Sequence, residues 1–374
     1  MKILHTIYDD PSNPWLGGGG AFRTFEISKR LTDKHDITIL CGRYPGSVAD
    51  ETLDGVHIRR VGSSQSYPIS RLTYSLLASR IVEQSDADLW VYSFSAFAPL
   101  MVSKSRRQGS LLECFHVMQD HASEKRGWLG HVAAVIERKT IIAYDRILSI
   151  SPSVQREIGT IRGSLDGIDL VYTGVDDACF IEDTDERDYI LYFGRLDTYT
   201  KGLDLLIEAY ARILPDIGDI RLIIAGRGTP DKVAELERLA TQHGVEDRIE
   251  LTGPVDTETR TDLYRGSLFN VTPSRYEGWC IAAVEASAAG KAVVGTRIPG
   301  LQDAVQHGKT GLLVESGNVD QIAEAMRSLT SDSALRHELG TGGREWASQF
   351  RWYRIAQAQD RVYEETLRSQ PGVQ

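Results

Sequence analysis

The residues best suited to chemistry lie between positions 273 and 286. Glu277 stands in a predicted loop, and Glu285 stands on the helix predicted to follow it. At about 1.5 Å per residue their separation spans roughly 12 Å, which is too far for the paired carboxylates of a glycosidase. They are better spaced to hold two ends of one extended ligand, such as the sugar and the ribose of a nucleotide sugar. Helix N–H groups at residues 279–282 could then bind its phosphates.

Two cations on one predicted loop could stabilise a diphosphate. Arg195 follows a strand predicted to end at Gly194, and Lys201-Gly202 opens the next predicted helix. The guanidinium fork of arginine and the point charge of lysine can converge on phosphate oxygens beside a helix N-terminus. The alternative is a pair of solvated surface cations.

Glycines 17–20 lie in the first predicted strand-to-helix loop, where their backbone N–H groups could approach a phosphate. The alternative is a flexible loop tip. No glycine run completes the G-x-G-x-x-G pattern, and the first glycine that a Walker A loop would need falls on Asp303, so dinucleotide redox and P-loop functions are disfavoured. His116 ends another predicted strand, although a lone histidine is more often structural. The Asp86-x-Asp88 pair only precedes a strand, and we expect no metal.

Short β-branched runs alternate with amphipathic helical patterns along the whole chain, which predicts parallel α/β sheets. In the first half the predicted strands are 2–8, 37–41, 89–93, 110–115, 146–150 and 168–172, and the helices are 21–32, 72–84, 128–143 and 153–159. In the second half the strands are 189–194, 220–225, 248–251, 268–271 and 292–295, and the helices are 203–214, 230–243, 256–264 and 279–289.

An acidic stretch without periodicity at residues 176–188 interrupts the alternation of strands and helices and predicts a linker. The alternation begins again after it. We therefore expect two doubly wound Rossmann-like domains, residues 1–176 and 177–351, facing an interdomain cleft. A last helix, at about 352–370, is predicted to pack back on the first domain. Ligands of such sheets bind at the carboxyl ends of the strands.

The composition supports two sizeable cores and excludes a small binding module or a disordered chain: 374 residues, 41% hydrophobic and 25% charged. The net charge is −10, with 20 basic and 20 acidic residues in 1–176 and 22 against 32 in the remainder. This field argues against nucleic acid as a partner.

Four widely spaced cysteines predict buried thiols in a reducing compartment. The N-terminal apolar run is too short for a signal peptide, and no stretch of 18 apolar residues exists. We expect a cytoplasmic protein that is peripheral to the inner face of a membrane at most.

With these motifs the chain resembles the retaining glycosyltransferases of the two-domain GT-B kind, and is similar to glycosyltransferase family 4 (glycosyl transferases group 1). The Glu277-x7-Glu285 motif, within Pro-Ser-x-x-Glu-Gly-Trp-Cys-Ile, carries the resemblance. Supporting segments are Gly194-Arg-Leu196 with Lys201-Gly202, Ala225-Gly-Arg-Gly228, Thr173-Gly-Val-Asp176 and Gly308-Lys-Thr-Gly311. The first half matches through the glycine loop, His116 and residues 145–151.

The resemblance implies a hexosyltransferase-like enzyme that moves a sugar from a nucleotide-diphosphate sugar, most readily a UDP- or GDP-sugar, to a carbohydrate or lipid-linked acceptor. Arg195 and Lys201 would bind the diphosphate, Glu285 the ribose, and Glu277 and His116 the transferred sugar. The remaining residues implied for the donor site are Gly18, Gly19, Gly194, Gly226, Gly278, Trp279, Cys280 and Ile281. The implied mechanism is front-face transfer with retention, without a metal or other cofactor.

Other interpretations stay open. A phosphorylase or a nucleotide-sugar epimerase would have the same architecture, and a nucleotide-sugar-binding protein without turnover is a third class. Short basic clusters in the first domain, at residues 104–107 and at residues 126, 138 and 139, leave open a peripheral membrane contact; the alternative is that they are solvated.

Overall fold

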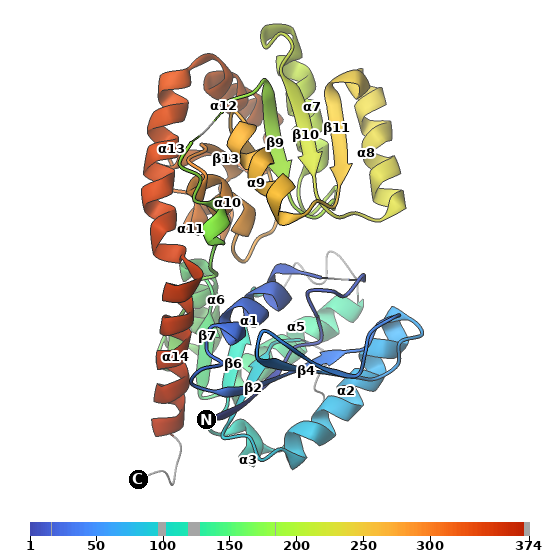
Figure 1. Cartoon of the computed structure of the whole chain (residues 1–374), viewed down its shortest axis with the longest axis vertical. Helices are drawn as coiled ribbons and strands as arrows, with labels where there is room; N and C mark the ends of the chain where they lie inside the picture. The colour runs from blue at the N-terminus through green and yellow to red at the C-terminus, as the bar shows by residue number, and fades with distance from the viewer. Residues whose placement is uncertain (16, 96–101, 119–127, 184, 370–374) are drawn as a thin grey trace. The chain divides into compact units, whose positions relative to one another are not determined.

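The computed structural model describes the whole chain except residues 16, 96–101, 119–127, 184 and 370–374. The chain divides into unit 1, residues 1–173 with 352–374, and unit 2, residues 174–351 (Figure 1). The division lies at Thr173/Gly174 rather than at 176/177. The reason is that the N–H of Val175 donates a 2.8 Å hydrogen bond to the carbonyl of Phe350, which anchors this segment to unit 2.

Unit 1 is built on an eight-stranded sheet of order β3-β4-β2-β1-β5-β6-β7-β8, in which only β3 runs antiparallel to its neighbour. The strands are β1 Lys2–Thr6, β2 Asp36–Gly42, β3 Asp50–Leu53, β4 Val56–Val61, β5 Leu89–Ser93, β6 Leu111–Cys114, β7 Arg146–Ser149 and β8 Ile168–Leu170. Its described helices are α1 Gly19–Lys29, α2 Tyr67–Gln84, α3 Lys104–Arg107, α5 Trp128–Ala143, α6 Pro152–Arg162 and α14 Trp352–Arg368.

Strands β3 and β4 form a hairpin that the expected elements omitted. Its two-residue turn is Asp54-Gly55, and both residues have positive φ, 48° and 81°. This is the turn type that Asp-Gly favours between twisted strands. The signal was therefore present in the sequence as Asp-Gly followed by alternating buried residues at Val56, Ile58 and Arg60.

Unit 2 has a six-stranded parallel sheet of order β11-β10-β9-β12-β13-β14. The strands are β9 Tyr189–Phe193, β10 Arg221–Ala225, β11 Ile249–Gly253, β12 Asn270–Thr272, β13 Val293–Thr296 and β14 Gly311–Val314. The helices are α7 Leu203–Ile213, α8 Pro230–His243, α9 Thr257–Gly266, α10 Ile281–Ala288, α11 Leu301–Ala304, α12 Val319–Ser331 and α13 Ser333–Ala347, with short 3-10 turns η1 Asp177–Cys179, η2 Leu214–Asp216, η3 Glu246–Arg248 and η4 Ser348–Phe350.

Local sequence sets several of these helix ends. Helix α6 begins after Ser151, whose hydroxyl accepts the N–H of Val154, and ends at Gly163 in the left-handed region. Helix α8 begins with Pro230 at its first turn and also ends at a left-handed glycine, Gly244.

Both doubly wound sheets were expected, and the structure confirms them.

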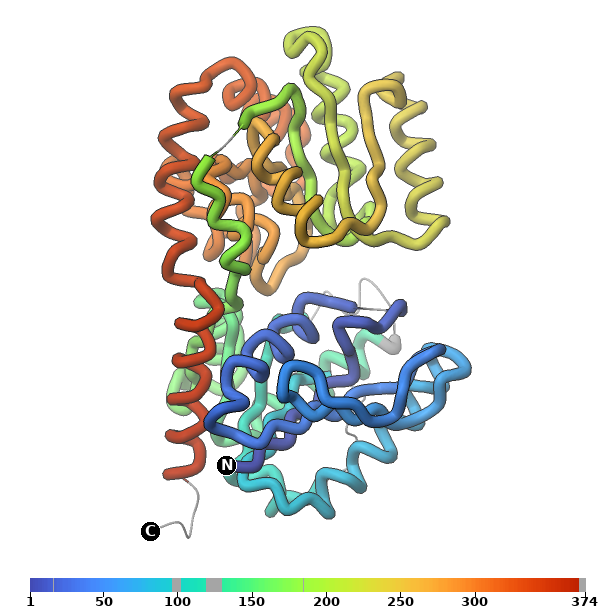
Figure 2. The backbone as a smooth tube through the Cα atoms, in the orientation of Figure 1, coloured from blue at the N-terminus to red at the C-terminus, as the bar shows by residue number. Residues whose placement is uncertain are grey.

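The last helix, α14, packs on α1 of unit 1, and the two lie side by side in both views (Figures 1 and 2). The rings of Trp352 and Phe22 meet edge to face, with centroids 5.8 Å apart. Farther along, Oδ1 of Asp360 lies 2.6 Å from Nε2 of His35. Aromatic packing and a buried polar contact therefore hold the C-terminal helix on the first unit.

A fully buried polar network joins five elements of unit 1: α1, α14 and the strands β1, β5 and β6. Arg23 of α1 donates to the carboxylate of Glu113 on β6 and, at 2.9 Å, to the side-chain oxygen of Gln359 on α14. Glu113 also accepts a 2.9 Å hydrogen bond from Ser93 and lies 3.2 Å from Nε2 of His5. These partners, Arg23 first among them, outweigh burial and lower the pKa of Glu113 to about 2.

All four cysteines are free and buried, as expected. Among the described residues, none of the helices is both long and apolar enough to span a bilayer.

Candidate functional site

Lys201 and Glu277 contact each other at the carboxyl edge of the unit 2 sheet. Nζ of Lys201 lies 2.6 Å from Oε1 of Glu277, and the hydroxyl of Ser274 donates a 2.9 Å hydrogen bond to the same oxygen. Burial alone lowers the pKa of Lys201, but the carboxylate outweighs it and raises that pKa above its ordinary value. The two predicted catalytic residues therefore form an ion pair in which the lysine is charged.

The loops that carry this pair are held together by backbone contact. Gly202 has a φ of 67°, and a Cβ there would lie 2.0 Å from the carbonyl oxygen of Pro273. The N–H of Arg275 donates to the carbonyl of Thr200 at 2.9 Å, and its guanidinium binds both carboxylate oxygens of Asp204. Because the two loops approach this closely, Lys201 reaches Glu277.

Replacing Gly202 with alanine is therefore expected to destabilise unit 2. The positive φ costs about 1 to 2 kcal/mol for an L-residue, and the Cβ clash adds to that cost. Gly218→Ala is the matched control because Gly218 also has positive φ, 63°, but has no atom within 4 Å of the added Cβ. Urea unfolding measures both variants. Equal losses of stability would show that the close approach to Pro273 is unimportant.

Arg195 stands at the same edge, two residues after the end of β9. Its side chain is exposed, and within the described ranges its guanidinium has no hydrogen-bond or ion-pair partner. Gly194 and Gly226 directly follow the neighbouring strands β9 and β10, and a Cβ on Gly226 would lie 1.9 Å from the carbonyl oxygen of Gly194. The glycines thus allow the two strand ends to come together beside an arginine that is available to a ligand.

Glu285 lies on the second turn of α10 and is buried. Its Oε1 lies 3.0 Å from Nη1 of Arg260, and its Oε2 accepts a 3.0 Å hydrogen bond from the hydroxyl of Tyr264. Burial raises the pKa of Glu285, while Arg260 and Tyr264 act against that shift. Both carboxylates of the predicted motif are therefore paired with a cation, Glu277 with Lys201 and Glu285 with Arg260.

Helix α10 begins at Ile281, between the two carboxylates, and therefore two residues later than the expected start at residue 279. The side chains of Trp279 and Cys280 point into the protein: the Trp279 ring meets Phe350 edge to face at 5.1 Å, and burial raises the pKa of Cys280 to about 12. What this segment offers a ligand is therefore the backbone of Gly278 and the first N–H groups of the helix.

The other predicted residues belong to unit 1. Helix α1 begins at Gly19, after Gly18 as its N-cap. The carboxylate of Asp9 accepts the N–H groups of Gly17 and Gly18 at 3.0 and 2.7 Å, so the backbone donor of Gly18 is already engaged by an internal anion. The N–H expected to approach a phosphate at Gly18 is thus satisfied within the chain.

His116 follows β6 and is exposed. A Cβ on Gly20 would lie 2.6 Å from the ring of Phe115, the residue before His116. The glycine loop and the segment that carries His116 are therefore packed against each other at the carboxyl edge of the unit 1 sheet.

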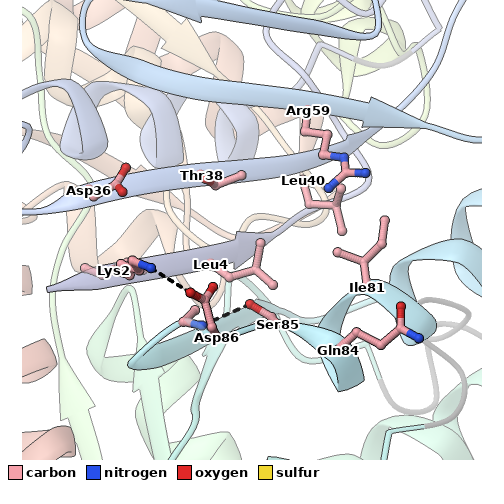
Figure 3. Close-up of a pocket in the computed structure, with 12 residues that line it drawn as sticks. Lys2, Leu4, Asp36, Thr38, Leu40, Arg59, Ile81, Gln84, Ser85 and Asp86 are labelled. Atoms are coloured by element: carbon pink, nitrogen blue, oxygen red, sulfur yellow. Dashed lines mark hydrogen bonds and ion pairs between the residues drawn. The ribbon is translucent and has the colours of Figure 1, made fainter.

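An open hollow of about 430 Å³ lies at the opposite, amino edge of that sheet (Figure 3). Lys2 and Asp36 begin β1 and β2 there, and Nζ of Lys2 lies 2.6 Å from Asp86. The carboxylate of Asp88 accepts the backbone N–H of Lys2. The Asp86-x-Asp88 pair thus binds a lysine, and no group of three or more His, Cys, Asp or Glu residues in the described part of the chain could hold a metal ion.

Sequence reasoning missed two residues of the site region, Arg260 and Asp9. The sequence carries a signal only for Asp9, which follows the first strand and precedes the glycines. Arg260 is one of many charged residues on a polar helix, and only the packing of α9 beside α10 brings it to Glu285.

Comparisons with known proteins cover nearly the whole chain. Residues 17–178 match the family model described as Glycosyltransferase Family 4, and residues 180–346 match Glycosyl transferases group 1. A D-inositol 3-phosphate glycosyltransferase of Kribbella flavida is 31% identical to this chain. The alignment is 398 residues long and covers 96% of this chain and 93% of that protein.

A GDP-mannose-dependent alpha-(1-6)-phosphatidylinositol monomannoside mannosyltransferase of Mycobacterium tuberculosis is 27% identical to this chain. The alignment covers 86% of this chain and 88% of that mannosyltransferase. Among solved structures, sucrose-phosphate synthase of Thermosynechococcus elongatus superposes with a TM-score of 0.81 at 21% identity, over 99% of this chain and 100% of that one. This likeness confirms the expected α/β fold of the GT-B type.

Proposed function

Because the chain belongs to the glycosyltransferases of family 4 and group 1, we propose that it transfers a hexose from a nucleoside-diphosphate sugar to an acceptor hydroxyl with retention of configuration. The observation that carries this proposal is the Lys201–Glu277 ion pair at the carboxyl edge of the sheet, formed between the loops that precede helices α7 and α10. It places a cation and a carboxylate where an open α/β sheet binds its ligand.

In this proposal Lys201 and the exposed Arg195 bind the diphosphate, and the first N–H groups of α10 add their partial positive charge. Glu277 accepts hydroxyls of the transferred sugar, and Glu285 accepts the hydroxyls of the ribose. His116 and the start of α1 near Gly19 serve the sugar and the acceptor. Gly194, Gly226 and Gly278 leave room for the donor beside the backbone.

The proposed step breaks the bond between the anomeric carbon and the β-phosphate oxygen and forms a bond from that carbon to the acceptor oxygen on the same face. The departing phosphate oxygen takes the proton of the acceptor hydroxyl, so the products are a glycoside and a nucleoside diphosphate. Negative charge develops on the diphosphate, and two preorganised cations beside a helix N-terminus stabilise it. We propose that no metal is needed.

The nucleotide we propose is UDP or GDP, and the acceptor a carbohydrate or a lipid-linked glycan. One relative is named as GDP-mannose-dependent, and the names of two relatives include an inositol phosphate or a phosphatidylinositol glycoside. The choice between the two bases depends on the shape of the site rather than on a motif.

A binding panel tests the proposal. We expect one of the UDP-, GDP-, ADP- or dTDP-sugars to raise the Tm of the full chain and to be hydrolysed slowly in EDTA. A ligand at a hundred times its Kd raises the free energy of unfolding of the protein by about 2.7 kcal/mol. No binding at millimolar concentration would contradict the proposal. Phosphate-dependent product formation would instead indicate a phosphorylase, and donor conversion without release of the sugar an epimerase.

We also propose that unit 1 docks on the inner face of a membrane through an α2–α5 surface, made of Ile69, Leu72, Leu76, Val132, Val135 and Ile142. Helix α2 has an unusual distribution of side chains: Ser75 and Ser79 are buried, whereas Leu72 and Leu76 are 59% and 52% exposed. Helices α2 and α5 contribute residues to one hydrophobic core, so both cover the same face of the sheet. The exposed cations Arg138 and Lys139 on α5 suit anionic headgroups.

The double variant Leu72→Ser/Leu76→Ser is expected to lower binding to vesicles of phosphatidylglycerol and phosphatidylcholine by about tenfold or more, because each buried leucine contributes about 1.5 to 3 kcal/mol. Vesicle co-sedimentation measures the effect. Leu53→Ser/Leu165→Ser, which changes two other exposed leucines, is the matched control. If the two double variants bind alike, the surface is not the docking site.

A further inference from the structure

Arg260 on α9 lies between two carboxylates of unit 2 and contacts both. Its Nη1 lies 3.0 Å from Oε1 of Glu285, and its Nη2 lies 3.1 Å from Oδ2 of Asp176. The arginine side chain is 14% exposed and that of Glu285 is 5% exposed. The guanidinium is therefore held at two points, and one of them is a residue of the proposed donor site.

Asp176 is itself fixed by the backbone. Its Oδ1 accepts the N–H of Ala178 at 3.1 Å, as the N-cap of the short turn η1. A carboxylate with one oxygen on a helical turn and the other on an arginine has little rotational freedom. It therefore sets the orientation of the guanidinium that faces Glu285.

Arg260 and Tyr264 together determine where the Glu285 carboxylate points. They stand one helical turn apart on α9 and bind opposite oxygens of the carboxylate, at 3.0 Å each. Each carboxylate oxygen has a second lone pair, so two acceptor positions remain for a ligand. Burial raises the pKa of Glu285, and Arg260 is the first group that acts against that shift. The arginine thus favours the ionised, acceptor-only form.

We propose that Arg260 is a positioning residue for the donor: it orients the Glu285 carboxylate so that its remaining lone pairs accept the 2′- and 3′-hydroxyls of the ribose. This inference rests on the proposed function, in which Glu285 binds the ribose. Arg260 itself does not contact the donor. The family motif contains the two glutamates but not this arginine, which comes from a different helix.

The test removes the guanidinium of Arg260 from the protein and, separately, the two ribose hydroxyls from the ligand. The probes are UDP and GDP, whichever binds the full chain more tightly, and the 2′,3′-dideoxy form of the same nucleotide. Calorimetry gives both Kd values for the wild-type chain and for Arg260→Leu. We expect the wild type to prefer the ribonucleotide by about tenfold or more, the usual size of hydrogen bonds to a charged group, and Arg260→Leu to lose most of this preference.

Arg265→Leu is the matched control, because Arg265 is on the same helix but exposed, with an ion-pair distance of 3.9 Å to Asp262. We expect it to keep the wild-type preference. If Arg260→Leu weakens both nucleotides equally and keeps the preference, the arginine is merely structural and the inference is overturned.

Failure of the proposed function has a different outcome. If the wild-type chain binds neither nucleotide, or binds ribo and dideoxy forms alike, Glu285 does not bind a ribose and both proposals fall. Should Arg260→Leu not fold, Arg260→Gln and Tyr264→Phe are measured instead, since the first removes the charge but keeps a polar side chain, and the second removes one hydrogen-bond donor but keeps the ring. Retention of the full preference by both would overturn the inference.

Discussion

Replacing either cation of the site with alanine is expected to lower turnover by about 10²-fold or more. Negative charge develops on the leaving diphosphate, and a preorganised donor aimed at such charge is worth about 2.7 to 4 kcal/mol of barrier. Arg195 is exposed and unpaired within the described part of the chain, so Arg195→Ala should change stability by less than about 0.5 kcal/mol. Lys201→Ala also leaves Glu277 without its cation.

Steady-state kinetics with the donor identified by the binding panel measure both variants, and urea unfolding confirms that each is folded. Lys232→Ala is the control, because Lys232 pairs with Glu235 on the exposed side of α8 and lies outside the site. Turnover near that of the wild type in both Arg195→Ala and Lys201→Ala would refute the assignment of the diphosphate site.

The second large effect concerns the buried network of unit 1. Arg23→Met is expected to destabilise the chain by about 3 to 5 kcal/mol, because it leaves the fully buried carboxylate of Glu113 without its cation. The double variant Arg23→Met/Glu113→Met removes both charges, and we expect it to recover much of that loss. Urea unfolding at pH 7 measures the three proteins. If the double variant is as unstable as the single one, the unpaired charge is not the cause.

The same network predicts a pH dependence. The pKa of Glu113 is lowered from its usual 4.5 to about 2, so its contribution is complete above about pH 4.5 and is lost as the pH falls from there toward 2. At roughly 1.4 kcal/mol per pH unit, this amounts to about 3 kcal/mol. The free energy of unfolding of the wild type should therefore fall more steeply across this interval than that of the double variant. Parallel curves would contradict the lowered pKa.

Much of the fold could be predicted because its strands are short β-branched runs bounded by turn residues. The motif with Glu277 and Glu285 could likewise be recognised, since it places a loop carboxylate and a helical carboxylate at a spacing that suits one extended ligand. The β3–β4 hairpin was missed although its Asp54-Gly55 turn is a strong local signal. An acidic stretch after residue 176 looked like a linker, but Cys179 and Ile181 are buried within unit 2.

The partners of the site could not be predicted from spacing. Lys201 reaches Glu277 only because Gly202 allows its loop to touch Pro273. Arg260 reaches Glu285 only because α9 packs near η1 and α10. Asp9 occupies the N–H groups of Gly17 and Gly18, which a glycine run alone suggested were open to a phosphate. Such contacts depend on tertiary packing, which local sequence patterns do not predict.

Proton NMR of the sugar released from an α-linked UDP- or GDP-sugar, in EDTA and at early times, tests the central claim most directly. If two protein cations support front-face transfer to water or to an added acceptor, the first anomer to appear is α and its rate does not depend on divalent metal. Initial release of the β anomer, or release that requires a divalent cation, would contradict retaining, metal-independent transfer by this chain.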